Sequence, residues 1–115
     1  MDIIWIALAV LAVAAAGGLT LAVAFVRRRP YPVSVGYLHG AIGSIGVVLL
    51  GIAVFGRAQG MPVNSALLLF CLALVGGLFN FVFRLQRAPP HGFMIILHGA
   101  VALAGLAVLL IGLLG

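Results

Sequence analysis

Four long apolar runs dominate the sequence and leave few ways for it to fold. The runs cover about 3–26, 33–55, 65–86 and 92–114, and the 115 residues include only six arginines and one acid, Asp2. Each run has the roughly 20 residues that a helix needs to cross the hydrocarbon core of a bilayer. Backbone groups in lipid must be satisfied within the segment, so such runs form helices. We therefore expect an all-α membrane protein with four transmembrane helices in one membrane domain, residues 1–115.

The composition excludes several classes of function. The chain is 66% hydrophobic and 6% charged, whereas ordinary soluble domains are about 25% charged. Connections this short leave no room for a soluble domain, so a nucleotide-binding or hydrolytic domain would have to belong to a partner chain. The net charge of +5 comes from arginines between apolar runs. Such arginines set membrane topology, and we expect no nucleic-acid partner. A cleaved signal peptide is disfavoured because Asp2 stands where a positive charge is usual.

A tetrapeptide that occurs twice indicates an internal duplication. Leu38-His39-Gly40-Ala41 recurs as 97–100, and the same offset of 59 residues aligns 1–56 with 60–115 without gaps. Seventeen of these 56 positions are identical, including a pair of glycines, 17–18 and 76–77. Biased composition gives some matches by chance, but not a tetrapeptide that includes a rare histidine. We expect two parallel helical-hairpin repeats, 1–56 and 60–115, joined in an up-down bundle.

The arginines predict how the chain lies across the membrane. Three of them separate the first two runs, and Arg84 and Arg87 lie where the third run ends, whereas only Arg57 lies in the middle connection. Short loops rich in arginine stay in the cytoplasm. This predicts cytoplasmic first and third loops and both termini outside, in a bacterial-type inner membrane.

The two repeated histidines are the main candidates for a function. His39 and His98 each lie about six residues into their runs, roughly 9 Å along a helix, and both of those helices start on the same side. Neighbouring axes in a bundle are about 8–10 Å apart. The second and fourth helices would therefore be roughly 12–14 Å apart across the diagonal. That spacing suits two imidazoles that reach inward to one metal centre.

Small residues and arginines near the histidines favour one b-type haem. His39 and His98 would be its axial ligands, since facing histidines in bundle cores commonly hold haem. Small residues on the same helices would leave space for the porphyrin edge, and arginines would pair with its propionates. Electron transfer, with quinol as one candidate partner, would follow from such a centre. The expected cofactor-binding residues are Gly36, Gly40, Gly43, Gly46, Gly99, Ala102, Gly105, Arg28 and Arg87.

Three alternatives stay open at this point. Histidines near the membrane interface also form plain hydrogen bonds between helices, and glycine stripes commonly mark packing seams. The chain would then be a non-catalytic structural or accessory subunit of a larger membrane complex, or a homodimer. A small transporter is disfavoured because only Thr20, Ser44 and Asn80 offer polar groups within the spans. Two histidines alone make a poor zinc site, which needs three or four ligands. Nothing in the sequence indicates a self-contained enzyme, and an electron carrier or subunit is favoured.

Overall fold

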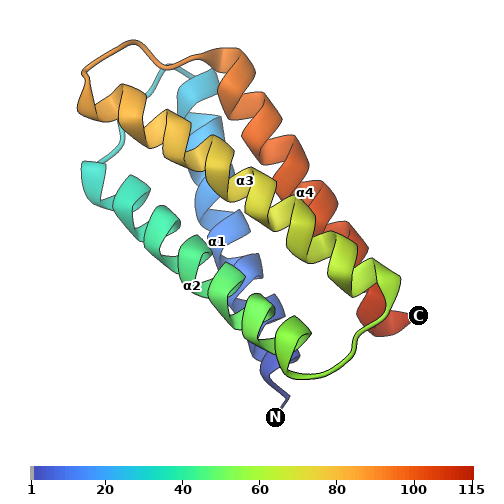
Figure 1. Cartoon of the computed structure of the whole chain (residues 1–115). Coiled ribbons are helices and arrows are strands. Elements are labelled where there is room, and N and C mark those ends of the chain that lie inside the picture. The colour runs from blue at the N-terminus through green and yellow to red at the C-terminus, as the bar shows by residue number, and fades with distance from the viewer. Residues whose placement is uncertain (1) are drawn as a thin grey trace.

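The structure, a computed structural model that describes residues 2–115, consists of four helices and their short connections (Figure 1). The helices are α1 (Ile3–Val26), α2 (Val33–Gly56), α3 (Met61–Leu85) and α4 (Gly92–Leu114). All four are long and apolar enough to cross a membrane. Helices of 23 to 25 residues are about 35 Å long at 1.5 Å per residue, slightly more than the hydrocarbon core of a bilayer. The chain thus has four candidate membrane spans.

The helix boundaries follow the apolar runs closely, with one difference. α3 begins at Met61, four residues before the expected start of the third span. Pro62 lies in the first turn of this helix, where a missing backbone N–H and a fixed φ angle do no harm. The segment after Gly60 looks like a loop in the sequence, but it is the first turn of α3.

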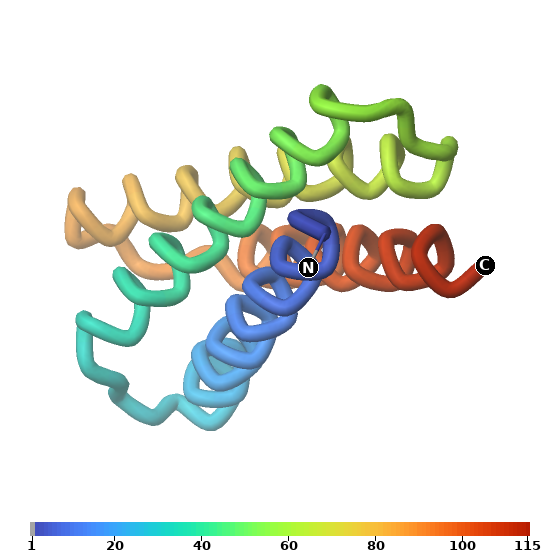
Figure 2. The backbone as a smooth tube through the Cα atoms, turned by 90° about the horizontal axis from the view of Figure 1, so that it is seen from below, coloured from blue at the N-terminus to red at the C-terminus, as the bar shows by residue number. Residues whose placement is uncertain are grey.

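Each helix packs most closely on its neighbour in sequence, α1 on α2 and α3 on α4. Contacts of α2 with α3 and of α1 with α4 join the two hairpins, whereas α2 and α4 make no close backbone contact. The two hairpins run obliquely to each other (Figure 2). The connections α1–α2 and α3–α4 lie at one end of the molecule, and the two termini lie at the other (Figure 1). We call these the arginine end and the terminal end.

The fully buried residues of 2–115 all lie in the part of each helix that is nearer the terminal end. Ala7, Ala66, Leu50 and Leu109 are completely covered, and they form two pairs of positions 59 residues apart. Leu11 and Phe70, another such pair, belong to the same cluster. Large apolar side chains elsewhere on all four helices are exposed, as expected for surfaces solvated by lipid. The tight helix packing is therefore concentrated at the terminal end.

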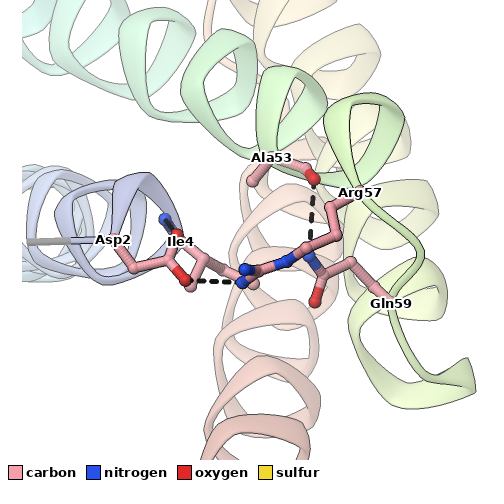
Figure 3. A network of polar contacts seen from close by, with 5 residues as sticks. All are labelled: Asp2, Ile4, Ala53, Arg57 and Gln59. Atoms are coloured by element: carbon pink, nitrogen blue, oxygen red, sulfur yellow. Dashed lines mark hydrogen bonds and ion pairs between the residues drawn. The ribbon is translucent and has the colours of Figure 1, made fainter.

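Asp2, the only acidic residue of the chain, forms a helix cap and an ion pair at the terminal end. Asp2 caps α1 by accepting a hydrogen bond from the backbone N–H of Ile4 over 3.3 Å. Its other carboxylate oxygen lies 2.7 Å from the guanidinium of Arg57, which follows α2 directly (Figure 3). Gln59 donates a hydrogen bond to the carbonyl of Ala53 at the same place. The charge of Arg57 is thus matched within the chain.

Arginines end α1 and α3 in an unusual backbone conformation. Arg28 and Arg87 have φ angles of 53° and 54°, in the left-handed region that normally takes glycine. The N–H of Arg29 bonds the carbonyl of Ala24, five residues earlier, and that of Arg28 bonds Phe25. The same pair of bonds closes α3. This is the Schellman motif, here with a side chain at the position where one costs about 1–2 kcal/mol.

Replacing Arg28 with glycine should therefore stabilise the protein. We expect Arg28→Gly and Arg87→Gly each to raise the free energy of unfolding by about 0.5–1 kcal/mol, and the gains to add because the sites are separate. Unfolding of the purified protein in mixed micelles by increasing denaturing detergent measures this. Arg27→Gly is the control, because Arg27 has a φ of −84° and gains nothing from glycine. Equal effects at Arg27 and Arg28 would contradict the interpretation.

Candidate functional site

Each repeated histidine is bonded to the backbone of the other helix in its hairpin. His39 of α2 has its Nδ1 2.8 Å from the carbonyl oxygen of Ala14 in α1. His98 of α4 has its Nδ1 2.7 Å from the carbonyl oxygen of Ala73 in α3. Ala14 and Ala73 are themselves 59 positions apart. The two hairpins thus contain the same bond between the same positions.

Glycines make room for these bonds. In a helix the carbonyl of Ala14 faces the residue four positions later, Gly18. A Cβ atom placed on Gly18 would lie 2.8 Å from Cε1 of His39, and one on Gly77 would lie 3.1 Å from Cε1 of His98. Real Cβ atoms almost never make a contact as close as 2.8 Å, so the His39 imidazole could not stay in place, whereas at 3.1 Å the His98 ring would have to move by a few tenths of an ångström. The paired glycines of α1 and α3 are therefore the surfaces on which the two histidine rings lie.

The hydrogen bonds also determine which ring nitrogen carries the proton. A carbonyl oxygen can only accept, so Nδ1 of each histidine is the donor. In a neutral imidazole the other nitrogen, Nε2, then holds a free lone pair. No hydrogen bond to either Nε2 occurs within residues 2–115. Histidines that bind metals generally have this arrangement, with the second ring nitrogen bonded to a carbonyl or carboxylate that fixes the ring.

The two rings approach each other across the diagonal of the helix arrangement. Their centres are 6.0 Å apart, and their planes are inclined by 85°. Both side chains are half-buried. The backbones of α2 and α4 do not touch. The rings nevertheless approach each other, because each imidazole extends over a glycine of the neighbouring helix.

This separation fits two imidazoles that share one metal. Imidazole nitrogens bind metals at about 2.0–2.1 Å, and each nitrogen is roughly 1.2 Å from its ring centre, so a linear pair would place the ring centres roughly 6.5 Å apart. The observed 6.0 Å is within a small ring movement of that value. Within the described residues, no third histidine, cysteine or acid joins the pair. Two nitrogen ligands suit a metal whose other ligands come from a macrocycle.

The small residues of α2 divide into three groups. Gly46 is buried against Leu11, whose side chain would lie 2.7 Å from an added Cβ, so its space is filled by α1. Gly43 also packs on α1, at Ala14. Gly40 faces open space with no atom within 4 Å and is exposed. Gly36 has only the guanidinium of Arg84 nearby, at 3.9 Å. Of the four glycines, Gly46 and Gly43 therefore pack on α1, whereas an added Cβ on Gly40 or Gly36 meets no atom closer than 3.9 Å.

The matching residues of α4 and the two arginines are placed in a similar way. Gly105 is buried against Phe70 of α3. Gly99 has no atom within 4 Å of an added Cβ, and Ala102 is half-buried. Arg28 and Arg87 are exposed in the connections at the arginine end, the end at which the helices that carry His39 and His98 begin. Neither arginine contacts a histidine.

The other polar residues in or next to the spans make no hydrogen bond to His39 or His98 within residues 2–115. Thr20 and Ser44 donate hydrogen bonds to carbonyls four residues earlier in their own helices. His91 precedes α4 and stacks on Phe83 with ring centres 4.9 Å apart. Asn80 is half-buried. Of the three polar side chains within the spans, Thr20, Ser44 and Asn80, the first two are bonded within their own helices. The structure therefore gives no support to a hydrated path through the molecule.

A shallow groove between α3 and α4 leads from the lipid-facing surface to His98. It has a volume of about 320 Å³, and its walls include Gly76, Phe79, Met94 and Leu97. The lining is almost wholly apolar, apart from the imidazole. A lipid-soluble molecule could reach His98 from this side.

The sequence did not reveal the carbonyls of Ala14 and Ala73 as partners of the histidines. A signal was present, however, because the glycine pairs 17–18 and 76–77 recur at the same offset as the histidines. Glycines that repeat together with a polar residue indicate that the two features meet.

Comparison of the chain with protein-family models, with curated proteins and with solved structures finds no match. The geometry of the site is therefore the basis on which function is inferred.

A methyl group on Gly18 should displace the imidazole and break its bond to Ala14. We expect Gly18→Ala to lower the free energy of unfolding by about 1–3 kcal/mol, as overpacking in a closely fitted site does. Gly77→Ala should cost less, because its added Cβ is 0.3 Å farther from the ring. Detergent-denaturation curves of the variants measure both effects.

Gly40→Ala is the matched control for these variants, because an added Cβ there meets no atom within 4 Å. It should leave stability unchanged or slightly improved. If Gly18→Ala proved as harmless as Gly40→Ala, the close seating of the imidazole on Gly18 would be wrong.

Proposed function

We propose that this chain is a small membrane cytochrome that holds one haem b between His39 and His98. The observation that carries the proposal is the pair of equivalent imidazoles, 6.0 Å apart, each with its Nδ1 proton held by a carbonyl. Both Nε2 lone pairs are thereby available as ligands. Haem b ligated in this way transfers one electron at a time.

The proposal includes the arrangement of the chain in the membrane. Two parallel helical hairpins, 1–56 and 60–115, would form an up-down bundle with the arginine end in the cytoplasm and both termini outside. Five of the six arginines lie in the connections or last turns at the arginine end, and Arg57 lies at the other. This distribution supports a bacterial-type inner membrane, where arginine-rich loops stay inside.

The protein's own residues would carry out three tasks around the haem. The carbonyls of Ala14 and Ala73 would fix the orientation of the rings and increase the basicity of Nε2. Half-burial among apolar helices would limit access of water, and the absence of a side chain at Gly36 would admit the edge of a flat group. Arg28 and Arg87 are at the correct end to meet propionates, although both are exposed in this structure. The groove that reaches His98 would admit a quinol from the lipid.

A second function, a structural or accessory subunit, is favoured by one specific observation. Each histidine bonds within its own hairpin, so the pair could serve only to hold α1 on α2 and α3 on α4. The exposed apolar surface on all four helices would then contact another membrane protein or a second copy as well as lipid. The two functions differ in what Nε2 does, and this difference can be tested.

A visible spectrum of the detergent-purified protein tests the first proposal directly. We expect a sharp Soret band and, after reduction with dithionite, resolved α and β bands of low-spin haem with two nitrogen ligands. The protein should be produced with added haem precursor, so that supply does not limit loading. A protein that remains colourless after haem is supplied would overturn the cytochrome proposal and favour the accessory subunit.

Asparagine substitutions separate ligation from helix clamping. The side-chain amide of asparagine resembles the Nδ1 side of imidazole and can donate to the same carbonyl, but it has no group at Nε2. We expect His39→Asn and His98→Asn to keep most of the stability of the apoprotein and to lose low-spin haem. His39→Ala should lose both, with a stability cost of about 0.5–1.5 kcal/mol from the lost hydrogen bond.

His91→Asn is the control for these variants, because His91 has no matching histidine in the other half of the chain. Its haem spectrum should be unchanged. Retention of the low-spin spectrum in both His39→Asn and His98→Asn would exclude these residues as axial ligands.

A further inference from the structure

At the arginine end, between α3 and the start of α2, lies the one side-chain hydrogen bond that joins the two hairpins within residues 2–115. Arg84, in the last turn of α3, donates a hydrogen bond from Nη1 to the hydroxyl oxygen of Tyr31 over 3.0 Å. Its guanidinium carbon is also 5.2 Å from the centre of the Tyr31 ring. Tyr37 and Phe81 meet edge to face beside it, with ring centres 5.8 Å apart. We call these four residues the α2–α3 seam.

All four residues of the seam depart from the repeat. The positions that correspond to Arg84 and Tyr31 hold Phe25 and Pro90, and those that correspond to Phe81 and Tyr37 hold Ala22 and Ile96. The matching contact between α1 and α4 is thus apolar, with the Phe25 ring 3.8 Å from a Cβ placed on Gly92. The histidine bonds recur in both halves, whereas the bond between Arg84 and Tyr31 occurs in one place only.

The seam presents hydrogen-bond donors that the chain itself does not use. A guanidinium has five N–H groups, and only one bond of Arg84 is found within residues 2–115. The Tyr31 hydroxyl accepts that bond and keeps its own proton to donate. The guanidinium carbon also lies within cation–π distance of the Tyr31 ring, 5.2 Å from its centre. A fixed, planar arginine beside a hydroxyl donor matches the oxygens of a phosphate.

The chain supplies no anion for this arginine. Its single acid, Asp2, lies at the terminal end and is bonded to Arg57. The other four arginines of the arginine end, Arg27, Arg28, Arg29 and Arg87, are exposed. Their field adds to that of Arg84 and attracts negative charge to this face. An anion bound to Arg84 would therefore come from outside the chain.

Aromatic side chains next to the donors indicate where that anion comes from. Tyr37 lies six residues after Tyr31, and Phe81 lies three residues before Arg84, so both are deeper along their helices. Tyr37 is 51% exposed and Phe81 is 38% exposed, and both belong to candidate membrane spans. Their apolar surfaces face hydrocarbon directly beneath the phosphate donors. A ligand that fits both parts carries a phosphate and an acyl chain.

We propose that the α2–α3 seam binds one anionic phospholipid. Its phosphate contacts the guanidinium of Arg84 and the hydroxyl of Tyr31, and an acyl chain lies along Tyr37 and Phe81. The site exists once per chain, because the matching contact between α1 and α4 has no donor. The proposal does not depend on haem, and the apoprotein serves to test it.

Thermal unfolding of the full chain in mild detergent, with lipid titrated into the micelles, measures the binding. The probes are phosphatidylglycerol, phosphatidylcholine and inorganic phosphate at matched concentrations. We expect phosphatidylglycerol to raise the melting temperature in a saturable way, phosphatidylcholine to do so weakly, and inorganic phosphate to have little effect. Arg84→Gln should raise the half-saturating concentration of phosphatidylglycerol by about fivefold or more, the scale of one arginine near a membrane surface.

Two variants distinguish lipid binding from helix clamping and from general charge. Tyr31→Phe keeps the ring under the guanidinium and removes only the hydroxyl, so it should fold normally and bind phosphatidylglycerol severalfold more weakly. It also decides the matter if Arg84→Gln fails to fold. Arg87→Gln removes the same charge from the same end but from outside the seam, and it should weaken binding less than Arg84→Gln does.

Three results would overturn the proposal. Equal weakening by Arg87→Gln and Arg84→Gln would mean diffuse attraction and no site. Equal stabilisation by inorganic phosphate would mean a soluble anion and no lipid. Unchanged binding in Tyr31→Phe together with Arg84→Gln would mean that the seam only joins the hairpins. His39→Asn should bind phosphatidylglycerol as the unaltered chain does, so failure of the cytochrome proposal leaves this one intact.

Discussion

The bond from an imidazole to a carbonyl of the neighbouring helix controls most of the geometry around the candidate site. A helix carbonyl is normally covered by its own helix, and the side chain four residues later would block an approach from outside. Glycine at 18 and at 77 removes that obstacle. The bond then fixes the register of α1 on α2 and of α3 on α4. It also places both imidazoles at one depth and puts the proton on Nδ1. The availability of Nε2 and the separation of the rings both follow from this bond.

Much of the fold could be predicted from the sequence because lipid imposes a simple rule. Runs of about 20 apolar residues must become helices, and α1, α2 and α4 begin and end within a residue of the expected positions. The start of α3 at Met61 was missed because glycine and proline resemble a loop, whereas proline is tolerated in a first turn. The inward approach of His39 and His98, whose ring centres are 6.0 Å apart, could be predicted because the offset of 59 residues aligns the two halves of the sequence without gaps. Their roles as haem ligands stay a proposal.

The surroundings of the histidines were harder to predict because glycine patterns do not show which neighbour fills the space. Gly46 and Gly105 look like parts of a cofactor cleft, but side chains of Leu11 and Phe70 occupy the space beside them. Gly40 faces open space. Alanine gives no sign that its carbonyl is bonded from outside, so the only pointer to the carbonyls of Ala14 and Ala73 was the glycine pairs 17–18 and 76–77, which repeat together with the histidines. The contact between Arg84 and Tyr31 joins residues 53 positions apart that have no counterpart in the repeat.

The uneven distribution of buried residues has a consequence for how the molecule opens. Tight packing of Ala7, Leu50, Ala66 and Leu109 lies on the side of the histidines away from the arginine end. Regions with few buried contacts open at low free-energy cost, and the well-packed remainder of a domain can stay folded while they do so. In this molecule the helix segments on the arginine side of the histidines are such a region. A bulky flat cofactor could enter there by transient separation of the helix ends. Its binding would then rigidify the part of the protein that has the fewest buried contacts.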